Sequence, residues 1–291
     1  MKVLVTGANG FLGSHLVAAF AAAGHEVFAL EHSSSKLERL ADLSKDKIAL
    51  SDQIHLEDYF ARHAFDGIVH TVVHYGRGSG SQYLAMLDVN VKFPMKILSA
   101  AAGKLKFFIN CHTILTPEAS PYALSKEQFS QWAKILCQES GIDFWNLKMD
   151  QFFGPGEAAI QFPSKIVKAC LSNEKIELSG GEQLRDFTYV DDIVRGFVRV
   201  LEYIEQNPKP SYHNVGVGTG SPQKLKAFVE TIKKHTGSSS NLVFGRYPYR
   251  KGELELRGPD ISFLKGLGWS AKTDVDTGVK NLIASLSGGQ H

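Results

Sequence analysis

Short apolar runs alternate with amphipathic helical patterns along the first half of the chain. Nearly continuous Val, Ile and Leu in the apolar runs favours a parallel sheet that helices cover on both faces. Right-handed crossovers then join successive strands. The pattern predicts an α/β fold with a doubly wound parallel sheet. Strands are expected at 2–6, 26–30, 47–50, 67–73, 107–111 and 143–149, and helices at 14–23, 36–43, 56–63, 81–102 and 125–139.

A second, smaller region is predicted after residue 156, where the pattern becomes less regular. The patterns at 191–206 and 212–217 again resemble a helix and a strand of the sheet layers. We therefore expect a discontinuous division, with a first domain at 1–155 plus 185–217 and a smaller α/β cap domain at 156–184 plus 218–291. The expected elements of the cap are a helix at 164–172, a strand at 176–178, the segment 221–236 and the tail from 241.

Composition and charge exclude several classes of protein. The 291 residues carry a formal net charge of +2 without a long run of one sign, so no broad surface for nucleic acid or membrane is expected. The first residues contain no apolar stretch long enough for a signal peptide. Cys111, Cys137 and Cys170 form no CxxC pair, which favours a reducing compartment. We expect a soluble, cytoplasmic protein.

A glycine-rich turn connects the first strand to the first helix. Its three glycines permit a tight turn, a close backbone approach to a pyrophosphate and close packing of helix on strand. Free amides at the helix N-terminus then stabilise phosphates without a lysine. The spacing is GxxGxxG rather than GxGxxG, and the alternative is that the glycines only cap a helix. The turn predicts a Rossmann-type dinucleotide site formed by Thr6-Gly7-Ala8-Asn9-Gly10-Phe11-Leu12-Gly13.

Glu31 supports this prediction because it is an acid at the end of the second strand, close to the spacing expected after Gly13. Its carboxylate is suited to both ribose hydroxyls and repels a 2′-phosphate, which favours NAD. The alternative is a solvated glutamate in a turn. NADP stays open because a 2′-phosphate could bind to the nearby side chains His32, Ser33, Ser34 and Lys36.

Tyr122 and Lys126 are four residues apart in a helical pattern, so both side chains project from one face. A tyrosine hydroxyl with a pKa of about 10 acts as a base near neutrality only when a nearby cation stabilises the phenolate. Lys126 and an oxidised nicotinamide supply such charges. Thr113, just past the strand 107–111, is placed to share the proton and orient a substrate oxygen. The alternative for Tyr122 is a half-buried aromatic residue at a helix start.

These motifs together resemble the extended short-chain dehydrogenase/reductases, the NAD-dependent epimerase/dehydratase group of nucleotide-sugar enzymes. The resemblance extends from Met1 to Trp269, with the motifs in the family's order. It implies a nucleotide-diphosphate sugar as substrate, bound by the cap domain, and a homodimer. It rests on TGxxGxxG, Thr113, the segment Tyr122-Ala-Leu-Ser-Lys126 and the segment Arg185-Asp-Phe-Thr-Tyr-Val-Asp-Asp192.

The resemblance also implies roles for further residues. Arg185 and Arg250 match two arginines that hold the nucleotide diphosphate, although either could instead be a surface ion-pair partner. His74 lies where a sugar would approach. The positions matching cofactor-binding residues are Asp52 and Gln53 at the adenine, Thr71, Val72 and Val73 beneath the cofactor, and Asn90 near the active-site strands.

Departures from the family pattern narrow the reaction. Ile114 and Leu115 replace the Asp-Glu pair that follows the threonine in sugar 4,6-dehydratases, which disfavours dehydration. The family asparagine before the Gly-Pro turn is also missing, and Gln151 is its candidate substitute. The segments 70–77, 120–132 and 181–187 resemble the CDP-abequose and CDP-paratose synthase branch, whose members are 4-ketoreductases.

The leading hypothesis is therefore hydride transfer between nicotinamide and C4 of an NDP-4-keto-6-deoxyhexose, with an NDP-hexose 4-epimerase that retains NAD as the alternative. A dinucleotide-sensing regulator is the hypothesis of a different class. No metal site is expected, because on one strand face His70 and His74 would lie about 13 Å apart. For His112, beside Thr113, a structural role is at least as plausible as catalysis.

Overall fold

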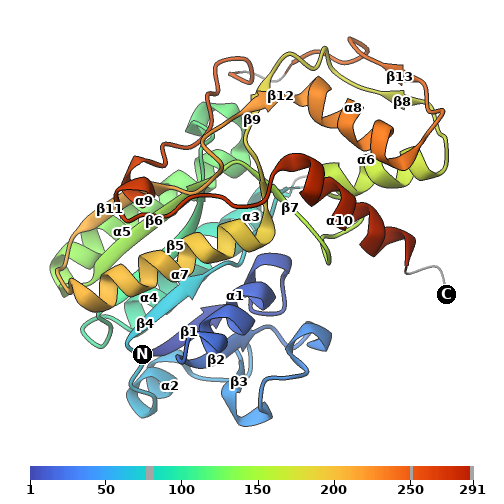
Figure 1. Cartoon of the computed structure of the whole chain (residues 1–291). Helices are drawn as coiled ribbons and strands as arrows, with labels where there is room; N and C mark the ends of the chain where they lie inside the picture. The colour runs from blue at the N-terminus through green and yellow to red at the C-terminus, as the bar shows by residue number, and fades with distance from the viewer. Residues whose placement is uncertain (77–81, 250–251, 289–291) are drawn as a thin grey trace. The chain divides into compact units, whose positions relative to one another are not determined.

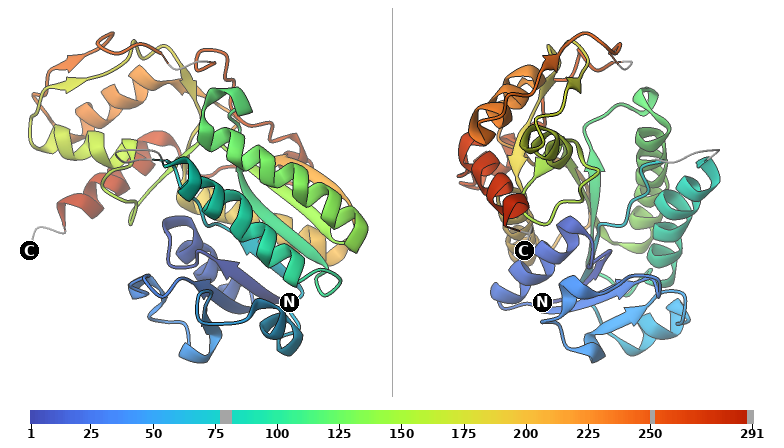
Figure 2. Two further views of the ribbon diagram at one scale, coloured as in Figure 1. Left: turned by 180° about the vertical axis from the view of Figure 1, so that it is seen from behind. Right: turned by 90° about the vertical axis from the view of Figure 1, so that its right-hand side faces the viewer.

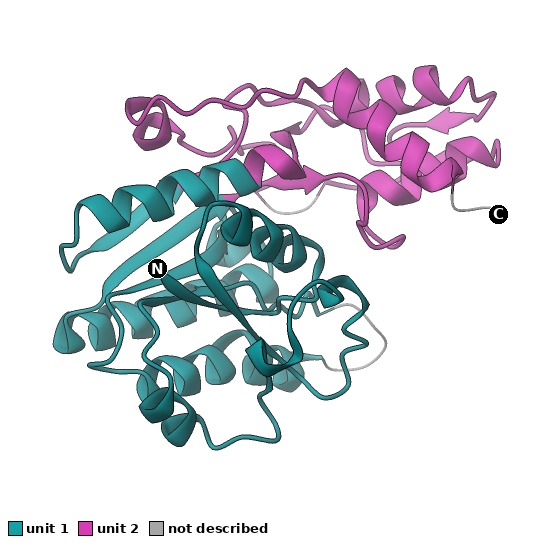
Figure 3. Ribbon diagram, turned by 60° about the horizontal axis from the view of Figure 1, so that its bottom comes forward, with its two compact units in different colours: residues 1–148, 194–215 teal, residues 149–193, 216–291 magenta. Residues whose placement is uncertain are grey.

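The structure is a computed structural model that describes residues 1–76, 82–249 and 252–288. Contacts divide the chain into two compact units (Figure 3). Unit 1 comprises Met1–Lys148 and Val194–Val215, and unit 2 comprises Met149–Ile193 and Gly216–His291. Both units are discontinuous in sequence. The functional division into a dinucleotide domain and a cap stays a prediction.

Unit 1 is built around a sheet that has seven strands in the described part of the chain, in the order β11-β6-β5-β4-β1-β2-β3 (Figure 1). The pairs β2/β3, β1/β2, β1/β4 and β4/β5 are parallel. From β1 the chain runs outward to β3 and then returns to β4 on the other side of β1. Such a switch point is where open α/β sheets bind ligands, at the carboxyl ends of the strands. The strands are β1 Lys2–Thr6, β2 Glu26–Glu31, β3 Ile48–Leu50, β4 Gly67–His70, β5 Phe107–Thr113, β6 Asp143–Met149 and β11 Tyr212–Gly216.

Helices cover both faces of this sheet (Figures 1 and 2). On the face that residues 121–140 cover, aromatic rings form a core between the sheet and the helices. Phe108 lies 5.9 Å from Phe129 and 5.6 Å from Phe144, measured between ring centroids. The predicted fold class is confirmed. On one face lie α1 Phe11–Ala22 and α7 Val190–Gln206, and on the other α2 Leu56–Arg62, α4 Phe93–Ala100 and α5 Pro121–Ser140.

The helix predicted at 36–43 is wrong. Only the single 3₁₀ turn Glu38–Leu40 forms there, after Leu37 in the left-handed region at φ 60°. The backbone N–H of Arg39 donates to the side-chain oxygen of Asn9 at 3.0 Å. A backbone donor that a regular helix would use is therefore bonded to the glycine turn.

The long helix predicted at 81–102 is interrupted. It consists of α3 Tyr83–Leu87, a π-helical turn Asp88–Lys92 and α4, and residue 81 lies outside the described residues. Pro94 has no N–H to donate to the preceding turn, so a regular α-helix cannot continue through it. Single π-turns of this kind are frequent at functional sites.

Three other boundaries change the picture of the site. Strand β4 ends at His70 rather than at residue 73, so His74 is not on the strand. Strand β5 continues to Thr113, which is its last residue. Helix α5 begins at Pro121, because the Ser120 hydroxyl caps it by accepting from the Ala123 N–H at 3.1 Å. Tyr122 therefore lies in the first turn of α5.

Unit 2 has its own core, packed between short strand pairs and helices. The rings of Phe187 and Phe228 stack with centroids 3.6 Å apart, and Phe153 joins them. The strand pairs are β7 Gln151–Phe153 with β10 Phe187–Tyr189, β9 Leu184–Arg185 with β12 Gln223–Lys224, and β8 Ile176–Glu177 with β13 Leu242–Val243. The helices are α6 Phe162–Leu171, α8 Leu225–Thr236, α9 Ser262–Gly266 and α10 Val275–Ser287.

Among the described residues, no helix combines the length and the apolar character that crossing a membrane requires.

Candidate functional site

The glycine turn brings the backbone of α1 against the ends of β1 and β4. Gly7 has φ +69°, and a Cβ there would lie 2.8 Å from the Thr71 hydroxyl oxygen. A Cβ on Gly13 would collide with the Gly7 carbonyl oxygen. Gly10 precedes α1 without a side-chain hydrogen bond to cap it. The turn therefore presents helix N–H groups across a surface of bare backbone, which fits a pyrophosphate.

Glu31 is buried beside this turn rather than solvated. The residue is 7% exposed, and its carboxylate accepts from the Asn9 backbone N–H at 2.8 Å and the Ser35 hydroxyl at 2.9 Å. The alternative of a solvated glutamate is wrong. The carboxylate is held at the last residue of β2. Phe11 and Leu12, which were also predicted to contact the cofactor, are the first two residues of α1.

Asp52 and Gln53 follow β3 and are exposed. Asp52 accepts from both the backbone N–H and the hydroxyl of Ser33, and these hydrogen bonds lower its pKa. Asp52 thus joins the segments after β2 and β3 at one rim of the sheet. Asp52 therefore lies at the same edge of the sheet as Glu31, and its contact with an adenine stays a prediction.

Residues 71–73 connect β4 to the site and are half-buried. The Thr71 hydroxyl donates to the Thr6 carbonyl at 2.8 Å and lies 3.1 Å from the Gly7 carbonyl. Val72 and Val73 follow in extended loop next to the glycine turn, and the Val72 N–H nitrogen would lie 3.0 Å from a Cβ on Gly7. These residues line the same backbone surface.

Asn90 connects the loop after β4 to α5. It lies in the π-helical turn, is fully buried, and accepts from the His74 N–H at 2.7 Å. Its amide donates to the His74 carbonyl at 2.8 Å and to the Ser125 hydroxyl at 2.9 Å. Ser125 in turn donates to the Tyr122 carbonyl at 2.8 Å. Asn90 is thus linked to the Tyr122 backbone carbonyl through the Ser125 hydroxyl.

Lys126 is buried, with 2% of the residue exposed. Burial lowers the pKa of Lys126 to about 8. Burial also raises the pKa of Tyr122, and the nearby Tyr75 and Cys111 add to this effect. Thr113 is 7% exposed, and its hydroxyl accepts from the Leu115 N–H at 3.2 Å, so its proton remains available to a ligand.

Sequence reasoning missed two neighbours of this group. The ring of Tyr75 lies 5.2 Å from that of Tyr122, at an interplanar angle of 36°. Tyr75 follows the strand in a loop, where no periodic signal exists. Cys111 is close enough to affect the pKa of both Tyr122 and Lys126. Alternation along β5 places Cys111 on the face of Thr113, and this signal was available.

The histidines have structural surroundings. His70 is fully buried, with Nδ1 2.7 Å from the Thr6 hydroxyl, and burial together with the Lys126 charge holds its pKa well below the ordinary value. Burial lowers the pKa of His112 to about 4, and its Nδ1 lies 2.8 Å from the Thr113 backbone nitrogen. His74 is half-buried after β4. In the described residues no three His, Cys, Asp or Glu side chains form a metal site.

Two of the predicted substrate residues, Arg185 and Gln151, lie in unit 2, whereas His74 lies in unit 1. Arg185 is 7% exposed, and its terminal nitrogen contacts a Glu253 carboxylate oxygen at 2.7 Å. The alternative that Arg185 is an ion-pair partner is thus met, although the pair is buried rather than at the surface. Gln151 begins β7 and is half-buried, while Arg250 lies outside the described residues. Burial raises the pKa of the neighbouring Asp150 to about 6.

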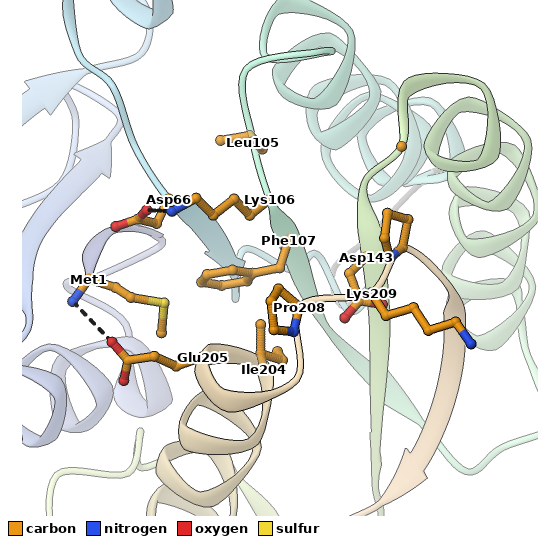
Figure 4. A pocket seen from close by; sticks show the side chains of 12 residues that line it. Met1, Asp66, Leu105, Lys106, Phe107, Asp143, Ile204, Glu205, Pro208 and Lys209 are labelled. Carbon is orange, nitrogen blue, oxygen red and sulfur yellow. Dashed lines mark hydrogen bonds and ion pairs between the residues drawn. The ribbon is translucent and has the colours of Figure 1, made fainter.

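A cavity of about 570 Å³ in unit 1 lies away from all these residues (Figure 4). It is lined by Met1, Phe107 and Asp143, which stand at or before the amino ends of β1, β5 and β6. Ion pairs between Lys106 and Asp66 and between Met1 and Glu205 flank it. The cavity is at the opposite ends of the strands from Thr113 and is no part of the candidate site.

Comparison with known proteins agrees with this geometry. The chain is similar to a CDP-abequose synthase of Salmonella typhimurium, with 29% identity over 98% of each chain, and to one of Salmonella muenchen, with 30% identity over 97% of each. Among solved structures, a UDP-glucuronic acid 4-epimerase from Bacillus cereus in complex with UDP-glucuronic acid and NAD matches with a TM-score of 0.85, at 21% identity over 99% of both chains. A UDP-glucose 4-epimerase from Thermotoga maritima matches with a TM-score of 0.82, at 23% identity and full coverage of both chains.

A family model covers most of the chain. The model described as "NAD dependent epimerase/dehydratase family" matches residues 3–216. The predicted family, its enzymatic character and NAD as cofactor are thereby confirmed. The chain belongs to the NAD dependent epimerase/dehydratase family.

Proposed function

We propose that this enzyme is a 4-ketoreductase that acts on the C4 keto group of an NDP-4-keto-6-deoxyhexose. The observation that carries the proposal is the buried Lys126 beside the half-buried Tyr122 in the first turns of α5, where the raised pKa of Tyr122 keeps the phenol protonated at neutral pH. The similarity to two CDP-abequose synthases supports the reductive direction and a CDP-linked sugar. Ile114 and Leu115 after Thr113 disfavour dehydration.

The residues of unit 1 fit a dinucleotide. Gly7, Gly10 and Gly13 would hold its pyrophosphate against the amides of α1, and Glu31 would accept from the adenosine ribose hydroxyls. Ser35 and Asn9 already orient the Glu31 carboxylate for this task. When bound, the nicotinamide supplies the hydride that C4 receives. NADP stays open, because the serines after Glu31 offer hydroxyls to a 2′-phosphate.

The chain's own groups supply the proton. Tyr122 donates its phenolic proton to the C4 oxygen while a hydride adds to the C4 carbon, so that the C=O group becomes CH–OH. The negative charge left on the phenolate is stabilised by the ammonium of Lys126. The Thr113 hydroxyl, which keeps its proton for a ligand, donates to the same oxygen and orients it.

The nucleotide would be held by residues of unit 2. Arg185 and Arg250 would bind the diphosphate, since a guanidinium forms bidentate hydrogen bonds with phosphate oxygens. Gln151 would contribute an amide contact, and His74 of unit 1 would face the sugar.

Two alternatives lead to different measurements. A 4-epimerase with tightly bound NAD would use the same proton chemistry in both directions, and this reading is supported by the structural likeness to two 4-epimerases. A dinucleotide-sensing regulator would bind cofactor without turnover.

The three free cysteines support a reducing, cytoplasmic location.

The test measures the absorbance of NADH in the presence of a CDP- or dTDP-linked 4-keto-6-deoxyhexose. A reductase consumes NADH in equal amount to product, whereas product without net loss of NADH would establish the epimerase. Tyr122→Phe should lower turnover by at least about 100-fold while NADH binding persists. Undiminished turnover of this variant would rule out the role of Tyr122.

A homodimer belongs to the same proposal. Helix α5 exposes Leu124, Trp132 and Ile135, and these positions share one helix face. The neighbouring α3, which packs against α5, exposes Tyr83 and Leu84. Exposed apolar side chains on two helices that pack together are typical of an interface between subunits.

A further inference from the structure

Arg185 has protein partners at each of its guanidinium nitrogens. One terminal nitrogen donates to the Leu184 carbonyl at 2.9 Å, and the other donates to a carboxylate oxygen of Glu253 at 2.7 Å. The Nε atom lies 4.0 Å from an oxygen of Asp150. With 9% of its side chain exposed, Arg185 has little room for an additional anion.

The two carboxylates differ in how firmly they are fixed. Asp150 has 3% of its side chain exposed and also accepts from the Asp186 N–H at 2.8 Å. Glu253 has 13% of its side chain exposed and lies in the turn at 252–255, a segment without helix or strand. Glu253 is thus the outer partner of Arg185 and Asp150 the inner one.

Among the residues that the structure describes, the charges in this cluster leave no surplus positive charge for a phosphate. Asp186 is already satisfied by the Thr188 hydroxyl and by the N–H groups of Thr219 and Gly220. The guanidinium of Arg185 faces two carboxylates, those of Asp150 and Glu253. Within the described residues, a diphosphate entering this cluster would meet two carboxylates around one guanidinium, and like charges at such distances repel strongly in a buried setting.

We propose that Glu253 is an internal stand-in for the substrate's diphosphate, which holds Arg185 in the ligand-free protein and leaves it when a nucleoside diphosphate binds. This inference rests on the proposed function, because it takes Arg185 as a diphosphate-binding residue. The carboxylate keeps the buried guanidinium paired while no ligand is present, which avoids an isolated buried charge. The diphosphate then takes over the same nitrogen, and the turn at 252–255 moves away with Glu253.

The exchange has a measurable consequence for affinity. Every binding event must first break the Arg185–Glu253 pair, so the pair lowers the affinity for any ligand that carries the diphosphate. A nucleoside without phosphates does not compete with Glu253. The penalty should therefore depend on the phosphates and not on the base.

The experiment measures binding of CDP and UDP, and of cytidine and uridine, to the full-length protein by calorimetry. Glu253→Gln should tighten binding of the nucleoside diphosphate by about tenfold, the scale of one charged hydrogen bond, and leave the nucleosides unchanged. Glu255→Gln is the matched control, because it removes the same charge from an exposed position of the same segment. NADH binding to each variant verifies that the protein is folded.

Each other outcome contradicts the exchange. Unchanged or weaker binding of CDP and UDP to Glu253→Gln would mean that Glu253 does not compete with the diphosphate. Equally tighter binding of CDP and UDP to Glu255→Gln would mean that the loss of any negative charge in this segment causes the effect. If the wild type turns over a nucleotide sugar while Glu253→Gln binds like the wild type, only the exchange fails. If the wild type binds neither CDP nor UDP, the proposed function fails with it.

Discussion

Burial acts on Tyr122 and Lys126 in opposite directions, because it disfavours the charged form of each. The pKa of the phenol rises and that of the lysine falls to about 8. A phenol in this state stays protonated at neutral pH and therefore carries the proton that a donor needs. Lys126 is still charged below about pH 8 and can stabilise the phenolate that proton donation creates. This state of the two residues fits the proposed reduction of a ketone.

Reduction should lose rate as Lys126 loses its charge. The reacting form has a protonated lysine, so kcat/KM for NADH-dependent reduction is expected to be constant at low pH and to fall as pH rises through about 8. Lys126→Met should lower kcat/KM by about 100-fold or more and remove this fall. The measurement is a pH profile of both proteins, with NADH affinity by fluorescence as the control. A wild-type profile that is flat to pH 9.5 would contradict the assignment.

Most of the candidate site could be predicted from the sequence because its chemistry follows local motifs. The glycine turn, Glu31, Thr113, Tyr122 and Lys126 are all recognisable from residue type and spacing. Asn90 was recognised only as a matching position, and its hydrogen bonds to His74 and Ser125 required the fold. Long-range partners such as these leave no periodic signal.

At the scale of elements, predictions failed where tertiary contacts override local pattern. The segment 36–43 has helical periodicity, but the Arg39 N–H is bonded to Asn9. The segment 81–102 is helical in outline, but Pro94 and the buried Asn90 produce a π-turn within it. The short strand pairs of unit 2 were mostly missed, because strands of two or three residues have no period to detect.

Helix α6 provides the prediction at this scale. Its N-cap residue Gln161 makes no side-chain capping bond, and the buried Glu157 accepts from the Ser164 N–H at 3.3 Å instead. Burial raises the pKa of Glu157 to about 7, whereas the unfolded chain has the ordinary value of 4.5. The stability that this group contributes is therefore complete below about pH 4.5 and is lost as pH rises through about 7.

Glu157→Gln should remove this dependence, because its amide can still accept from Ser164 but does not titrate. We expect the variant to gain stability over the wild type as pH rises from 5 to 8, by up to about 3 kcal/mol, since one pH unit is worth about 1.4 kcal/mol. Thermal unfolding across this range is the measurement. Glu174→Gln, at an exposed position of the same unit, should show no such trend. A gap that is constant with pH would argue against a titrating Glu157.

At the scale of the whole molecule, the chain distributes its predicted chemistry over two units. The glycine turn, Thr113, Tyr122 and Lys126 belong to unit 1, and Gln151 and Arg185 belong to unit 2. The discontinuity of both units was foreseeable, because the pattern at 191–217 resembles sheet-layer elements after the irregular region. The chain thus passes from one unit to the other at several points in the sequence, and each unit carries one set of the predicted residues.

The apolar face of α5 carries the last prediction, which concerns assembly. Trp132 is 58% exposed and Ile135 is 53% exposed, next to the exposed side chains of α3. Placing charges there should prevent two copies from associating, because an unpaired charge at the centre of an interface has no compensating partner. We expect the wild type to sediment as a dimer of the 32.0 kDa chain and the double variant Trp132→Glu/Ile135→Glu to sediment as a monomer.

Ile160→Glu is the matched control, since Ile160 is 67% exposed but lies in unit 2, and this variant should stay dimeric. A monomeric wild type, or a dimer that tolerates both charges on α5, would show that this face has another role. Because α5 also carries Tyr122 and Lys126, the monomeric variant should lose turnover more than it loses NADH binding.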